Sequence, residues 1–111
     1  MKVKKGALVI TKLGNEERFI HVLAIVKEKT KDPSLKPWGI RLDESLAGGA
    51  SRLSLFGDES NMFPLILLPK KDRYLSPCAA FQTYLPQIVE EITPRIKELK
   101  EFLKAKPKIV P

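Results

Sequence analysis

The spacing of hydrophobic positions along this chain changes once, near residue 76. Before that point the apolar residues form short runs, and the run Phe19–Val26 is apolar throughout except for His21. Successive side chains of a strand point to opposite faces, so this run would present apolar side chains on both sides of a sheet. Both sides then need a covering layer. We therefore expect residues 19–26 to form a central strand.

Four more strands are expected around the central one. An apolar run within 3–13 predicts a first strand, and the loop residues 14–17 predict an antiparallel hairpin between that strand and the central one. Alternation predicts strands at 38–42 and 52–56, and the proline-containing apolar segment 62–68 predicts a fifth strand near a sheet edge. The residues expected to face inward on the third and fourth strands are Trp38, Ile40, Leu42, Leu53 and Leu55.

After residue 76 the apolar positions recur at steps of three and four, which is typical of one face of a helix. Ser76 followed by Pro77 predicts the N-cap and the first helical residue. Pro86 and Pro94 interrupt the pattern, so each either kinks the helix or starts a new one. A continuous helix over 77–104 would be about 42 Å long at 1.5 Å per residue, which exceeds what a β part with a radius of gyration of about 11 Å can cover. Either the prolines divide the helix or its distal half packs on a protein partner or a second copy; that half contains Ile96, Leu99, Phe102 and Leu103.

These elements predict an α+β protein. Residues 1–75 would form a small five-stranded antiparallel barrel or half-barrel, SH3-like or OB-like, and residues 76–106 a C-terminal amphipathic helical segment kinked or broken at Pro86/Pro94. Residues 107–111 would be a tail. The sequence Lys4-Lys5-Gly6 before the first strand resembles the start of many SH3-like barrels, including the ribonuclease toxins of that fold. Those toxins carry an acidic residue directly after the glycine, where this chain has Ala7.

Composition excludes several classes of function. The longest apolar run is far shorter than the roughly 20 residues of a membrane span, and the apolar segment after the basic N-terminus is too short for a secretion signal. We therefore expect a cytoplasmic protein with no membrane association. One cysteine and one histidine form neither a disulfide nor a usual structural zinc site, so we expect no metal and no cofactor.

No residue pattern predicts catalysis. Cys78 near the start of a helix could be an activated thiol, and His21 is the one available base, but a nucleophile needs its base within hydrogen-bond reach. We interpret both as packing residues. The acidic pairs 43–44 and 58–59 and the glycine pair 48–49 lack the spacing of cation or phosphate sites, so no catalytic residue is assigned.

The basic residues carry the functional hypothesis. The net charge is +7 and the isoelectric point is about 9.6, which favours binding to polyanions. Arg41 and Arg52 are expected on one outer face of the sheet, with Phe56 beside them as a stacking platform. Further basic residues lie at the ends of the expected strands: Lys4, Lys5, Lys12, Lys70, Lys71 and Arg73. The simpler interpretation is a basic solvated surface, and an alternative position for Phe56 is burial under the C-terminal helix.

The sequence thus favours a non-enzymatic module that binds DNA or RNA, as a small subunit of a larger nucleic-acid-processing or ribonucleoprotein assembly. One alternative is an adaptor that docks on a protein partner, or on a second copy, through its C-terminal helix. Another is a small ribonuclease toxin-like protein that uses Arg52, His21 and an acid.

Overall fold

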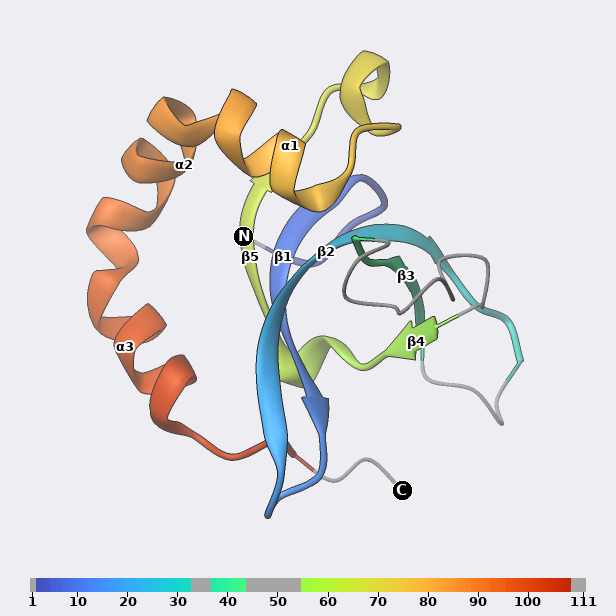
Figure 1. Ribbon diagram of the computed structural model, residues 1–111, viewed down its shortest axis with the longest axis vertical. Coiled ribbons are helices and arrows are strands. Elements are labelled where there is room, and N and C mark those ends of the chain that lie inside the picture. The colour runs from blue at the N-terminus through green and yellow to red at the C-terminus, as the bar shows by residue number, and fades with distance from the viewer. Residues whose placement is uncertain (1, 33–36, 44–54, 109–111) are drawn as a thin grey trace.

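A computed structural model describes residues 2–32, 37–43 and 55–108 (Figure 1). Five antiparallel strands form one sheet in the order β4-β3-β2-β1-β5. Their bounds are β1 (Ala7–Gly14), β2 (Phe19–Lys29), β3 (Trp38–Arg41), β4 (Leu55–Gly57) and β5 (Met62–Leu67). The α+β class and the five strands are therefore as the sequence predicts.

The sheet is not closed into a barrel, so the predicted closed form is wrong. Closure would require β4 to pair with β5, but these two strands are the edges of the sheet. The chain turns between them through η1 (Glu59–Asn61), which is capped by the Asp58 carboxylate accepting from the Ser60 amide. This turn takes β5 to β1 instead of back along β4.

The β1–β2 hairpin fixes the centre of the sheet. Its register runs from Leu8 opposite Ile25 to Gly14 opposite Phe19. Asn15 Oδ1 accepts hydrogen bonds from the two following turn amides, those of residues 17 and 18. The loop chemistry at 14–17 thus forms the predicted turn.

Both faces of β2 are covered, as the run 19–26 predicts. On the inner face, Val22, Ala24 and Val26 pack with Ile40 and with other strand residues in one apolar cluster. On the outer face, Ile25 belongs to a second cluster, formed with β1, β5 and the helices. The expected inward residues in the described part, Trp38, Ile40, Leu42 and Leu55, all belong to or pack on the inner cluster; Leu53 lies outside the described residues.

The C-terminal part is divided where the prolines lie. It comprises η2 (Lys70–Asp72), α1 (Pro77–Thr83), α2 (Leu85–Ile92), η3 (Thr93–Arg95) and α3 (Ile96–Lys104). Ser76 caps α1 by accepting from the Ala79 amide at 3.2 Å. Pro86 lies in the first turn of α2 and Pro94 lies within η3. The helical segments follow one another as an arc along one side of the sheet (Figure 1).

Among the described residues, the helices lie over the part of the outer face that β5, β1 and β2 form. Their main contacts are with β5, β1 and β2, whereas β3 and β4 lie at the far side of the sheet from α2 and α3 (Figure 1). Among the described residues, none of the helices has the length and apolar character needed to cross a bilayer.

Candidate nucleic-acid interface

The part of the outer face that the described helices leave uncovered is built around Gly39. Gly39 pairs with Phe56 of β4, and its neighbours along β3 belong to or pack on the inner cluster. Because strand side chains alternate, Gly39 and Phe56 face outward. Gly39 has no side chain, so the Phe56 ring lacks a side chain at the position directly opposite it.

A β-bulge brings two residues of β2 against Gly39. Val26 pairs with Ile40 and Lys29 pairs with Trp38, so residues 27 and 28 together oppose one residue of β3. A Cβ atom built on Gly39 would lie 3.8 Å from Lys27 Cβ and 3.6 Å from the carbonyl oxygen of residue 28. The bulge therefore places Lys27 across Gly39 from Phe56.

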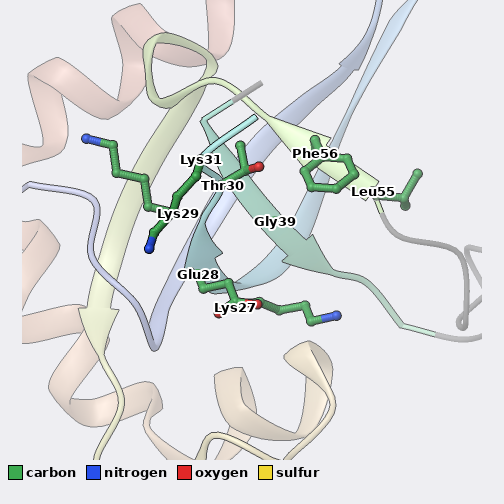
Figure 2. Close-up of a pocket in the computed structure, with 8 residues that line it drawn as sticks. All are labelled: Lys27, Glu28, Lys29, Thr30, Lys31, Gly39, Leu55 and Phe56. Carbon is green, nitrogen blue, oxygen red and sulfur yellow. The ribbon is translucent and has the colours of Figure 1, made fainter. Parts of the chain in front are cut away.

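A hollow of about 400 Å³ opens over this row. Figure 2 shows Lys27 and the Phe56 ring on opposite sides of Gly39, which forms the floor between them. Lys29 and Lys31 also line the hollow, with Glu28 as its acidic residue. The hollow thus contains an aromatic ring, and three of its four charged side chains are cationic.

A second hollow of about 290 Å³ adjoins the first, because both are lined by Lys27 and Glu28. Its other charged residues are Lys5, Arg41 and Arg73. We refer to the two hollows together as the basic groove. Among the described residues its cations are Lys5, Lys27, Lys29, Lys31, Arg41 and Arg73, and its one carboxylate is Glu28.

The two arginines of the basic groove are held by backbone carbonyls. Arg41 Nη2 donates a hydrogen bond to the carbonyl oxygen of Arg73. Arg73 Nε in turn donates to the carbonyl oxygen of Leu68 at 3.0 Å. Both side chains are half-buried, so they lose less rotamer freedom when a ligand binds than fully exposed arginines would.

Gly6 makes room for Arg73. Its amide donates to the Val26 carbonyl at 2.9 Å and its carbonyl accepts from the Leu68 amide at 3.0 Å, so it links β2 to the residue that follows β5. Its φ angle is +88°, and a Cβ at this position would lie 2.5 Å from Arg73 Cζ. The guanidinium packs on the bare backbone of a glycine.

Four of the predicted nucleic-acid-binding residues line the basic groove, namely Lys5, Arg41, Phe56 and Arg73. Lys4 is exposed next to Lys5, and Lys70 and Lys71 are exposed on η2, just before Arg73. Arg52 lies outside the described residues. Sequence reasoning missed Lys27, Lys29 and Lys31, although three lysines alternate directly after the apolar part of β2.

Lys12 lies elsewhere, against Phe102, a residue that packs on the outer cluster. Its side chain is 7% exposed, and its ammonium lies 4.1 Å from the centroid of the Phe102 ring. Burial, with a smaller contribution from the charge of Lys108, lowers the pKa of Lys12. An ammonium held over a ring and desolvated in this way is a poor phosphate ligand.

His21 is exposed, so its interpretation as a packing residue is wrong, although its ring contacts two aromatic rings. Its ring contacts Phe19 edge-on at 5.6 Å and Phe102 at 6.0 Å between centroids. Burial, and secondarily the charge of Lys12, lowers its pKa. Cys78 is exposed at the start of α1, so its interpretation as a packing residue is wrong as well. In the part of the chain that the structure describes, no group of three His, Cys, Asp or Glu side chains could hold a metal ion.

The four residues predicted to bind a partner fall into two pairs. Leu99 and Phe102 pack on the outer cluster, whereas Ile96 and Leu103 are each 40% exposed. Val89, seven residues before Ile96, is 51% exposed. The helical stripe is thus partly covered by the chain's own sheet and partly open to solvent.

No family model matches this chain, and no match is found among the curated proteins or the solved structures.

Proposed function

We propose that this chain is a non-enzymatic nucleic-acid-binding module and that the basic groove holds the phosphate backbone. The observation that carries the proposal is the composition of the groove, in which six cationic side chains and one carboxylate line two adjoining hollows, the first of which also contains a half-buried aromatic ring. Such a groove neutralises phosphates without reading base edges, so binding depends on salt more than on sequence.

We also propose that the sheet is a half-barrel of the SH3-like type. Strands β1 to β4 follow one another as neighbours, and β5 returns to pair with β1. The inner cluster packs on one face of this sheet, with residues from β1, β2, β3 and β5. This meander with a returning last strand supports the SH3-like form over the OB-like form.

Salt titration tests the proposed function. Each phosphate contact contributes about −0.7 to the slope of log K against log salt for a single strand and about −0.9 for a duplex. Fluorescence anisotropy with labelled DNA and RNA between about 50 and 200 mM salt measures this slope. We expect binding at low salt that weakens steeply as salt is added.

Two matched triple variants locate the binding surface. The first replaces Lys27, Lys29 and Lys31 by Gln. The control replaces the exposed Lys97, Lys100 and Lys104 of α3 by Gln, which changes the net charge equally. The groove variant should lose about 2 units of salt slope, at about 0.7 per contact, and the helix variant little. Equal losses in the two variants, or no binding at low salt, would refute the proposal. Cleavage of RNA that is lost on His21→Ala would point to the toxin-like alternative instead.

An adaptor function is the second candidate, favoured by the exposed stripe Val89, Ile96 and Leu103. These residues recur every seven positions and are 51%, 40% and 40% exposed. We propose a second copy of the chain as their occupant, packed antiparallel. The reason is charge complementarity: α2 carries two glutamates and no basic residue, whereas α3 carries three lysines and two glutamates.

The dimer is tested by light scattering at micromolar concentration. The expected result is a dimer mass for the wild-type chain and a monomer mass for Ile96→Lys, which leaves the residues facing the sheet unchanged. A monomer mass for the wild-type chain would exclude self-association.

A further inference from the structure

We infer that the basic groove selects single-stranded nucleic acid by stacking an unpaired base on the Phe56 ring. This inference rests on the proposed function and names its ligand class. It depends on how the Phe56 ring is packed in the sheet, because this packing differs from that of an ordinary core phenylalanine.

Phe56 lies on the edge strand β4, directly opposite a glycine. In most sheets a cross-strand neighbour covers part of an aromatic side chain, and that contact stabilises the pair. Here the neighbour is Gly39, so one side of the ring borders the hollow of about 400 Å³ instead. Inserting a planar apolar group beside the ring would restore the missing contact.

The phosphate of a nucleotide stacked on the ring would lie toward Lys27, across Gly39 from Phe56. Two strand spacings of about 4.8 Å each separate the backbone of Phe56 from that of Lys27, with Gly39 between them (Figure 2). Arg41 lies two residues after Gly39 and thus on the same face of β3. A base on the ring therefore has positive charge on two sides.

A duplex does not satisfy this geometry. Its bases are stacked on both faces, so one base would have to leave the helix to reach a ring that is itself half-buried in a hollow. Extruding a paired base is unfavourable, whereas a single strand has little or no such penalty. Stacking of bases on aromatic side chains is also tolerant of sequence, because every base has a π-face.

The test compares three labelled ligands of equal length: an oligothymidylate, a duplex, and a strand of abasic deoxyribose phosphates. The abasic strand keeps the phosphates but has no base to stack. The wild-type protein should bind the oligothymidylate about tenfold more tightly than either of the others, which corresponds to about 1.4 kcal/mol. In Phe56→Leu, an apolar replacement without a π-face, this preference should disappear while binding to the abasic strand is retained.

Two further variants cover the case in which Phe56→Leu disturbs β4. Phe56→Trp should keep the preference for the oligothymidylate. Gly39→Val should remove it by filling the floor of the hollow, since a Cβ at Gly39 meets its neighbours only at ordinary contact distances. Urea unfolding checks that each variant is folded.

The outcomes separate this inference from the proposed function. If none of the ligands binds at low salt, the proposed function fails, and the inference with it. If all three ligands bind equally to the wild-type chain, the groove binds phosphates but base stacking is refuted. If folded Phe56→Leu loses affinity for all three ligands in the same proportion, the ring positions the groove and does not stack on a base, which also overturns the inference.

Discussion

Replacing Gly6 by alanine should lower the free energy of unfolding and disturb the basic groove. The φ angle of +88° at this position costs an L-residue about 1–2 kcal/mol. The new Cβ would also overlap Arg73 Nε, so the guanidinium would have to move and its hydrogen bond to the Leu68 carbonyl would be lost. That charge-assisted bond contributes about 1.5 kcal/mol.

One opposing effect reduces the total loss of stability expected for Gly6→Ala. Alanine restricts the unfolded chain and so stabilises the protein by about 0.4–1 kcal/mol relative to glycine. The net loss expected for Gly6→Ala is therefore about 2 kcal/mol in the free energy of unfolding, since the strain and the lost hydrogen bond together exceed the entropic gain. Urea denaturation followed by circular dichroism measures this difference.

A double-mutant cycle tests the reasoning. Arg73→Ala alone should lose about 1.5 kcal/mol. In that background Gly6→Ala should cost only the backbone strain less the entropic gain, about 0.5–1 kcal/mol. If Gly6→Ala costs the same in both backgrounds, the glycine does not make room for Arg73. A total loss below about 0.5 kcal/mol would show that the backbone at residue 6 relaxes without strain.

Two other perturbations probe the end of the sheet where the C-terminus returns. Asn61 exchanges two hydrogen bonds with the backbone of Lys108, at 2.6 Å and 3.0 Å, so Asn61→Ala should lower the free energy of unfolding by about 1–2 kcal/mol and speed proteolysis after α3; an unchanged cleavage rate would contradict this. The single His21 can be titrated by NMR, and its pKa should lie below the ordinary 6.5. As the pH falls, His21 therefore binds its proton in the unfolded state before it does so in the folded state. The free energy of unfolding should decrease as the pH drops through 6.5 toward the folded pKa. Lys12→Met should raise the His21 pKa, and no change would exclude Lys12 as a cause.

The sheet could be predicted because its signals are local. The run 19–26 is apolar on both faces, and both faces are covered. The alternation at 38–42 correctly gives the inward side of β3, and Ser76 caps α1 where the period changes. Each of these features depends on residues that are adjacent in sequence.

Closure of the sheet could not be predicted, because it depends on how the chain turns between β4 and β5. The sequence 57–61 predicts a turn but not its direction. The capped η1 leads β5 to β1, so the two edges stay apart. The same kind of non-local packing decides which half of the helical stripe is covered: Phe102 rests on Phe63 of β5, at 5.7 Å between ring centroids, and no spacing within the helix shows this.

The site was predicted in part. The alternation of side chains between the two faces of a strand explains why Arg41 was placed correctly and Lys12 was not. Arg41 shares the outward parity of Gly39 and lines the groove. Lys12 has the parity of Leu8 and Ile10, which face the outer cluster, so its position against Phe102 of α3 follows from the same alternation along β1. Lys27, Lys29 and Lys31 were not predicted, because the bulge that places Lys27 against Gly39 has no sequence signal.

The bulge in β2 connects the fold to the proposed function. Up to Val26 the strand is apolar on both faces and lies between the two clusters. At residues 27–28 the ladder shifts, the helix layer no longer covers the outer face, and the side chains become charged. Bulges add twist and re-aim side chains, and they are frequent beside functional sites. The same irregularity that ends the covered part of β2 places Lys27 across Gly39 from Phe56. Regular pairing would oppose Gly39 with only one residue of β2, so the bulge is what adds the second residue at this position.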